Sequence, residues 1–264
     1  MQSYKKWLSA AAWICGLILV WEAASLLLDQ ILNDPMAEKK LPYLHQVLIS
    51  FKDYGASIMP EAWVTLTRAA IGFILGTAAG IILALLMDLS GIMKKMLMPY
   101  VLASQMIPIL GLAPVIFGLV KDLDTSRVII AAYITFFPVV IKLIQALDSV
   151  GAEERLLMKV CAAGKKDYYL KLALPFSMPY LFTGMKLAAP MAVTASVLVD
   201  TLSAKDGIGY VLILTLYGGG TTGKFWPALL ISAALGVCSF ILISLLQYIC
   251  IPWERKRKEV PSHE

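Results

Sequence analysis

The stretch Trp226-Pro-Ala-Leu-Leu-Ile-Ser-Ala-Ala-Leu-Gly-Val-Cys-Ser-Phe-Ile-Leu-Ile-Ser-Leu-Leu-Gln-Tyr-Ile-Cys250 decides the fold class, because it contains no charged side chain. A helix of about 20 apolar residues is long enough to cross a bilayer core of about 30 Å. Runs of similar length and composition occupy residues 7–28, 63–87, 97–120, 127–147 and 179–199. The sequence therefore predicts an all-α integral membrane protein with about six transmembrane helices.

The composition supports the membrane class and excludes others. The chain is 59% hydrophobic and 16% charged, whereas soluble domains average about 25% charged residues. The net charge of +5 does not predict a nucleic-acid partner, because the basic residues lie between the apolar runs and at the C-terminus. The cysteines (Cys15, Cys161, Cys238 and Cys250) lack metal-ligand spacing, so no metal site is expected.

The distribution of apolar and polar segments predicts three parts. Residues 1–62 form a first span, too long for the apolar core of a signal peptide, followed by an outer polar segment. Residues 63–250 form the core transmembrane domain, and residues 251–264 form a basic tail. With both termini in the cytoplasm, thirteen basic residues lie on the inner side and seven on the outer side. This bias predicts cytoplasmic termini.

Five charged residues fall within the runs or at their ends, where an ionised group is a functional candidate because hydrocarbon does not solvate it. Arg68, Lys142 and Lys186 lie near span ends and can extend their charged groups to the interface. Asp200 is expected where the fifth span leaves the membrane, within reach of water. Glu22 lies in the first span. For these groups, anchoring and solute contact are both open.

Two runs have unusual small-residue or proline patterns. Gly72, Gly76 and Gly80 are four residues apart and predict a smooth helix face for close helix packing. The third run, 97–120, contains several prolines and glycines and is expected to be kinked or broken. Such a break can line a cavity, although an ordinary membrane helix can also contain these residues. The candidate pathway-lining residues are Ser104, Gln105, Met106, Pro108, Gly111 and Pro114.

The stretch Gly218 to Phe225 nearly matches a phosphate-binding loop, G-x-x-x-x-G-K-[ST]. Phe225 has no hydroxyl for Mg²⁺, and no strand precedes the stretch. A nucleotide site in this chain is therefore not expected. No catalytic residues are predicted either, because the two histidines, His45 and His263, accompany no nucleophile–base pattern within the spans.

The longest predicted cytoplasmic connection runs from residue 148 to residue 179. Residues 152–163 predict an amphipathic helix with an apolar stripe, and Gly164 is expected to end it. A second short helix is expected from Lys165 to Leu174, with Pro175 and Pro179 ending it and beginning the next span. The apolar stripe can enter a groove of a partner protein, or it can lie on the bilayer surface.

This connection resembles the cytoplasmic "EAA" loop of ABC importer permeases. The similarity includes the stretch Val160 to Pro175, then Pro179 and Gly184-Met-Lys186. Two positions depart from the family pattern, because the usual Glu aligns with Leu156 and the usual Gly with Ala162. Further similar segments are Leu41-Pro42, Thr65-Leu-Thr-Arg68, Gly72-Phe73, Leu112-Ala-Pro114, Phe136-Phe-Pro138 and Gly207-Ile-Gly-Tyr210. Together they most resemble the branch serving nitrate, sulfonates, taurine, bicarbonate, thiamine-precursor pyrimidines and riboflavin.

The resemblance implies a multi-pass permease in the bacterial inner membrane. It implies an ABC ATPase subunit that binds ATP and Mg²⁺, an extracytoplasmic solute-binding protein, and a second permease copy forming a homodimer. Lipid surrounds it, and this chain would hold no cofactor of its own. A self-sufficient secondary transporter and a non-transporting scaffold are the alternatives. The implied ATPase-docking residues are Glu153, Glu154, Leu156, Leu157, Lys159, Val160, Cys161, Ala162, Ala163, Gly164, Lys165 and Lys166.

Overall fold

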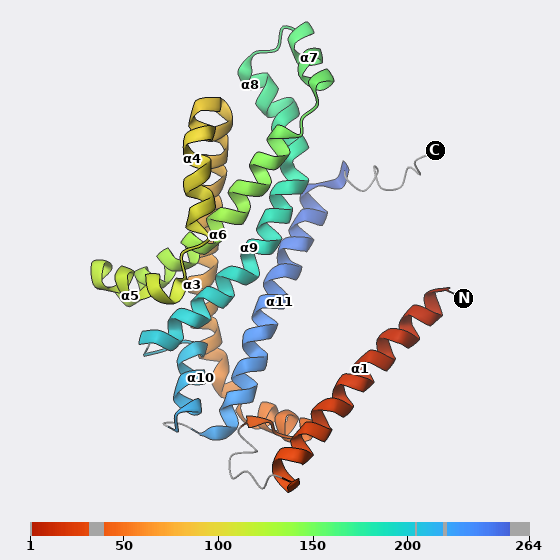
Figure 1. Cartoon of the computed structure of the whole chain (residues 1–264), viewed down its shortest axis with the longest axis vertical. Helices are drawn as coiled ribbons and strands as arrows, with labels where there is room; N and C mark the ends of the chain where they lie inside the picture. The colour runs from red at the N-terminus through yellow and green to blue at the C-terminus, as the bar shows by residue number, and fades with distance from the viewer. Residues whose placement is uncertain (1, 32–39, 204, 219–220, 254–264) are drawn as a thin grey trace. The chain divides into compact units, whose positions relative to one another are not determined.

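The computed structural model describes residues 2–31, 40–203, 205–218 and 221–253, and the described residues form helices joined by short turns (Figure 1). Five of these helices are long and apolar enough to cross a membrane, and a bent helix pair makes a sixth candidate. The prediction of an all-α membrane protein with about six spans is confirmed. Part of the outer polar segment and the basic tail from residue 254 onward lie outside the described residues.

The chain divides into two compact units. The first contains Met1–Glu61 and Val211–Ile231, and the second contains Ala62–Tyr210 and Ser232–Glu264. The helices α3 (Leu44–Leu89), α10 (Ile208–Leu216) and α11 (Phe225–Cys250) each contribute to both units. Helix α3 begins at Leu44, well before the predicted start of the span at residue 63. The second half of the predicted outer polar segment is therefore part of this helix.

In the first unit, α1 (Gln2–Leu26) and its π-helical extension η1 (Leu27–Ile31) precede the start of α3. The Trp21 indole N–H donates to the Pro42 carbonyl at 2.9 Å. Glu22 accepts a 2.8 Å hydrogen bond from the Leu44 backbone N–H, one of the N–H groups that the first turn of α3 leaves without a helical partner. Glu22 is therefore accounted for as a helix cap. A short turn, η3 (Thr222–Lys224), comes before α11.

The second unit is built on the pairing of α6 (Leu123–Asp148) with α9 (Leu174–Ser203). Gly184 of α9 lies where an added Cβ would be only 3.0 Å from the Pro138 carbonyl oxygen. The glycine face of α3 packs against α6 in the same way. A Cβ at Gly72 would overlap Ala131, one at Gly76 would overlap Thr135, and one at Gly80 would be 2.9 Å from a carbonyl of α6. These glycines allow the backbones to approach closely.

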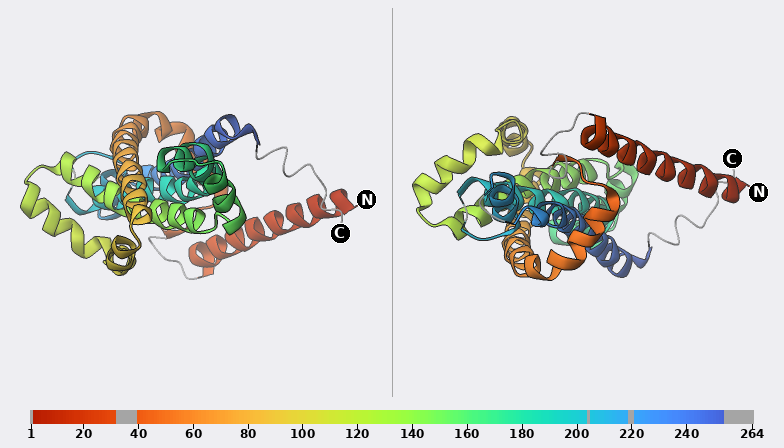
Figure 2. Two further views of the ribbon diagram at one scale, coloured as in Figure 1. Left: turned by 90° about the horizontal axis from the view of Figure 1, so that it is seen from above. Right: turned by 90° about the horizontal axis from the view of Figure 1, so that it is seen from below.

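The predicted third span is two helices. Helix α4 (Gly91–Ser104) and helix α5 (Ile109–Val120) meet at an angle of 101° (Figures 1 and 2). The break falls immediately before Pro108, which has no backbone N–H to continue a helix and favours an extended conformation in the residue before it. The expected kink is therefore present, and the non-helical stretch 105–108 forms an elbow between the two helices.

Candidate functional site

Helix α7 (Ala152–Val160) lies beyond the ends of α6 and α9 (Figure 1). Its apolar residues Leu156, Leu157 and Val160 are 61%, 63% and 75% exposed, respectively. Its attachment is polar, since the Arg155 guanidinium donates to the carbonyls of Leu147 at 2.9 Å and Val150 at 3.2 Å. Arg155 thus attaches the helix to backbone carbonyls, while Leu156, Leu157 and Val160 remain largely uncovered by the described part of the chain.

The end of α7 differs from the prediction. The helix ends at Val160, with Cys161 as its C-cap, rather than at Ala163. Ala162 adopts a left-handed conformation with φ of 49°, whereas Gly164 has φ of −71° and begins the next helix. The chain therefore turns at Ala162, the position where the EAA pattern has its glycine. Gly164 is not the helix-stop residue, because the left-handed residue has already ended the helix.

The second helix predicted in this connection is not separate from the following span. Helix α8 (Lys165–Tyr168), the π-helical turn η2 (Tyr169–Ala173) and α9 follow one another without a gap. Pro175 and Pro179 were expected to end the short helix, but both lie inside the continuous helical segment Lys165–Leu202. Pro175 comes two residues after the π-helical turn, where the regular helical hydrogen-bond pattern is already interrupted. Glu153, Glu154, Lys159, Lys165 and Lys166 are exposed around this corner.

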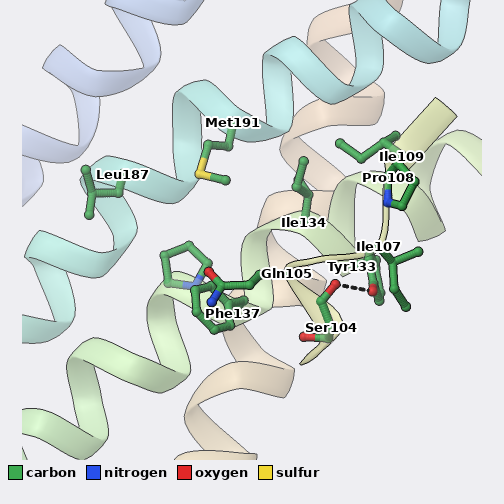
Figure 3. Close-up of a pocket in the computed structure, with 11 residues that line it drawn as sticks. Ser104, Gln105, Ile107, Pro108, Ile109, Tyr133, Ile134, Phe137, Leu187 and Met191 are labelled. Carbon is green, nitrogen blue, oxygen red and sulfur yellow. Dashed lines mark hydrogen bonds between the residues drawn. The ribbon is translucent and has the colours of Figure 1, made fainter. Parts of the chain in front are cut away.

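A pocket of about 490 Å³ lies at the elbow between α4 and α5 (Figure 3). Ser104, Gln105 and Pro108, predicted to line the pathway, line it together with Ile107 and Ile109. The remaining wall comes from Tyr133, Ile134, Phe137 and Pro138 of α6 and from Leu187 and Met191 of α9. The Tyr133 hydroxyl donates a hydrogen bond to the Ser104 carbonyl, which fixes the end of α4 against α6.

The other predicted pathway residues do not line this pocket. Met106 is in the elbow but is 77% exposed, and Gly111 and Pro114 are in the α5 helix. The elbow itself brings the aromatic residues of α6 and the apolar residues of α9 to the α4–α5 turn. The sequence did not identify Tyr133, Phe137, Leu187 or Met191 as pocket residues. The pattern of apolar residues marks a membrane span, but it does not show which neighbouring helix each side chain faces.

A partly buried ion cluster near the start of α6 was also missed. Arg127 is 1% exposed and lies 3.2 Å from Asp200, 2.8 Å from Asp206 and 3.1 Å from Asp124. Arg68 lies 2.8 Å from Asp124 and 3.1 Å from Asp206. We define these five residues as the ion cluster. It joins α3, α6, α9 and the turn before α10, elements that are far apart in the sequence.

Asp200 contradicts its expected position in water, since its side chain is fully buried. Its Oδ2 accepts a 2.6 Å hydrogen bond from the Thr65 hydroxyl, which in turn accepts from the Ile208 backbone N–H at 2.9 Å. Its Oδ1 is at ion-pair distance from Arg127 Nε but makes no hydrogen bond. Asp200 is buried because the turn before α10 covers the end of α9, which carries Asp200. Gly207, with φ of 94°, brings its backbone against Asp200 where a side chain would clash.

Arg68 also differs from the interfacial anchor expected of it, because it is paired with carboxylates rather than extended into water. Asp206, in the turn between α9 and α10, is partly exposed, as is Asp124. Burial alone would raise the pKa of Asp206, but the hydrogen bonds and charges of Arg127 and Arg68 outweigh that effect and lower the pKa below its ordinary value. Lys186, by contrast, places its ammonium 6.0 Å from the centre of the Phe240 ring.

The near-match to a phosphate-binding loop gives no structural support for a nucleotide site. Gly219 and Gly220 of this stretch lie outside the described residues. The described part runs through η3 directly into α11, with Phe225 as the first residue of that helix. No group of three metal-ligating side chains occurs among the residues that the structure describes.

Comparison with known proteins places these features in a family. The chain is 28% identical over 244 residues to the formylaminopyrimidine transport permease protein ThiX of Halalkalibacterium halodurans, covering 91% of this chain and 94% of that protein. It is 25% identical to the nitrate import permease protein NrtB of Synechococcus elongatus, covering 88% of this chain and 84% of that protein. The putative aliphatic sulfonates transport permease protein SsuC of Bacillus subtilis is 23% identical, over 81% of this chain and 78% of that protein.

A solved structure shares the fold. The crystal structure of an amino acid ABC transporter with histidines matches with a TM-score of 0.58 and 16% identity, over 77% of this chain and 97% of that chain. The model of the family described as binding-protein-dependent transport system inner membrane component matches residues 76–249. That range contains α7, the α4–α5 elbow and the ion cluster apart from Arg68. The chain belongs to this family of inner-membrane transport components, the permease subunits of ABC importers.

Proposed function

We propose that this chain forms half of the translocation path of an ABC importer, and that α7 docks on a separate ATPase subunit. The observation that supports the docking role is the exposure of Leu156, Leu157 and Val160 on one short helix. Large apolar residues grouped on a projecting helix fit helix-in-groove recognition, in which a partner groove covers the apolar face. The ATPase would bind ATP and Mg²⁺, and this chain would supply no catalytic group.

The proposed assembly contains two copies of the chain, an ATPase on the cytoplasmic side and a solute-binding protein on the opposite side. The relatives are described as permeases for formylaminopyrimidine, nitrate and sulfonates, and a small solute of this kind is the proposed cargo. Both termini are proposed to be cytoplasmic, which puts α7 on the side where ATP is available. The excess of basic residues in the segments on that side supports this orientation.

The docking role is tested by purifying the tagged chain from its native membranes in mild detergent and identifying the proteins that accompany it. The wild-type chain should retain an ATPase in a ratio near one to one. Val160→Asp should lose it, because a carboxylate would be buried in an apolar groove without a counter-charge. Val160→Ile is the matched control, since it keeps an apolar branched side chain at that position. Retention of the ATPase by Val160→Asp would reject α7 as the docking element.

Orientation is tested separately with reporter fusions. A phosphatase that is active only outside the cytoplasm should be inactive when it is fused after Trp253. An active fusion would reverse the proposed topology and remove α7 from the cytoplasmic side.

A further inference from the structure

We propose that the pocket at the α4–α5 elbow contacts the transported solute, and that it favours a neutral, planar nitrogen heterocycle over a small oxyanion. This inference rests on the proposed function, because it names the solute class of that translocation path. The pocket belongs entirely to the second structural unit, and its volume of about 490 Å³ is within the range of small-molecule sites.

The first argument is charge. None of the eleven described residues that line the pocket has an ionisable acid or base that is charged at neutral pH. Proteins bind small oxyanions with cationic side chains or with convergent backbone N–H groups, which replace the water that the anion loses. The pocket offers an anion no cationic side chain, only the first-turn N–H groups of α5, whose N-cap Pro108 and first residue Ile109 line it. The lining therefore favours a neutral solute over nitrate, bicarbonate and sulfonates, whose charge would lose most of its hydration in the apolar remainder of the pocket.

The second argument is complementarity to a ring. Tyr133 and Phe137 supply aromatic side chains on one wall, and Met191 supplies a polarizable thioether on another (Figure 3). Gln105 lines the same pocket and carries an amide with both donor and acceptor atoms. An amino-substituted heterocycle presents a donor next to an acceptor on its edge. Its ring can stack on the aromatic wall while that edge pairs with the Gln105 amide.

The third argument is the position of the pocket. It lies at non-helical backbone between two halves of a bent membrane helix pair. Irregular backbone at membrane depth occurs where it lines a cavity or is covered by protein. A transport site must also release its solute, so its affinity has to be weak. A few apolar contacts and one amide meet that condition.

The experiment is saturation-transfer-difference NMR on the chain with its ATPase, reconstituted in lipid nanodiscs. The probes are 4-amino-2-methylpyrimidine, at an alkaline pH that keeps the ring uncharged, and methanesulfonate. Each has a methyl group that reports contact with protein. We expect transfer to the pyrimidine, with dissociation in the millimolar range, and none above the empty-nanodisc background to methanesulfonate.

Two variants of Gln105 test the site itself. Gln105→Leu should weaken pyrimidine binding about tenfold, the effect of losing one or two hydrogen bonds. Gln105→Arg should create transfer to methanesulfonate, because it adds the missing cation. Gln145→Leu is the matched control, since Gln145 is an exposed glutamine of α6 outside the pocket lining, and it should bind as the wild type does.

The outcomes separate the two proposals. Equal transfer to both probes in the wild type, no transfer to either, or unchanged pyrimidine binding in Gln105→Leu would overturn the pocket assignment. The last result would place the ring at the lipid-facing surface or at an interface between copies. The ATPase that accompanies each preparation is measured in parallel. Its absence from the wild-type protein would count against the proposed function, whereas its retention with failed binding counts only against the pocket.

Discussion

Replacing Arg127 by methionine should be the most damaging single change in the ion cluster. Methionine keeps most of the volume of the side chain but removes a positive charge that lies within 3.2 Å of three carboxylates. Asp200 would then be buried with the Thr65 hydroxyl but without its cation at ion-pair distance. Removing one partner of a buried ion pair costs about 3–5 kcal/mol, because the remaining charge is left uncompensated. We expect a loss of this size in the free energy of unfolding.

The assay is reversible unfolding of the purified chain in mixed micelles of increasing denaturing detergent, followed by circular dichroism. Lys94→Met is the matched control, because Lys94 pairs with Asp148 at a site where both side chains are partly exposed. Exposed pairs contribute about 1 kcal/mol or less.

The double variant Arg127→Met with Asp200→Asn completes the test. It removes the stranded charge, so its loss of stability should be smaller than the sum of the two single losses. A loss below about 1 kcal/mol for Arg127→Met, or strict additivity in the double variant, would refute the argument that Asp200 and Arg127 depend on each other.

Three further predictions concern other features of the chain. Gly76→Ala should lower the free energy of unfolding by about 1–3 kcal/mol in the same assay, because the added methyl group would overlap Thr135. Gly236→Ala should not, since there is open space around Gly236; equal effects of the two changes would exclude close helix packing as the cause. Ala162→Gly should stabilise the turn after α7 by about 1 kcal/mol, since Ala162 has a left-handed φ of 49°. This change should slow amide hydrogen exchange in α7, whereas Ala163→Gly should not, and faster exchange in Ala162→Gly would contradict the prediction. The pKa of Asp206 is lowered in the folded chain, so its ion pairs stabilise the folded state at pH values above the unfolded-state pKa of about 3.9. The free energy of unfolding should fall as the pH drops through the lower folded-state pKa. Asp206→Asn should lose that pH dependence, and an unchanged pH profile in this variant would assign the dependence to other groups.

The sequence was sufficient for the features that depend on local composition. The bilayer imposes a length and an apolar character on each span, so the runs were visible without knowing their partners. The spacing of Gly72, Gly76 and Gly80 likewise marked the face of α3 that packs on α6. The prolines of the third run indicated a kink or break for a local reason, their missing N–H, although the helix is interrupted next to Pro108 and not at Pro99 or Pro114.

The features that were missed depend on contacts between distant segments. Arg127, the first residue of the 127–147 run, was counted among the seven outer basic residues, and Asp200 was expected within reach of water, because nothing in either local sequence shows that the two side chains meet. The wall of the elbow pocket that comes from α6 and α9 was invisible for the same reason. The end of α7 was misplaced because Gly164 is the usual residue for a left-handed turn, whereas the chain makes that turn with Ala162.

The attachment of α7 has an evolutionary consequence. Arg155 holds this helix through the carbonyl oxygens of Leu147 and Val150, and every amino acid provides such an oxygen. The outward side chains Leu156 and Val160, which are mostly exposed, therefore contribute little to keeping the helix in place. Under the proposed docking of α7, these residues can diverge together with the ATPase surface that covers them, so related importers within one cell would acquire separate ATPase pairings by changing a few exposed residues without altering the membrane-spanning core.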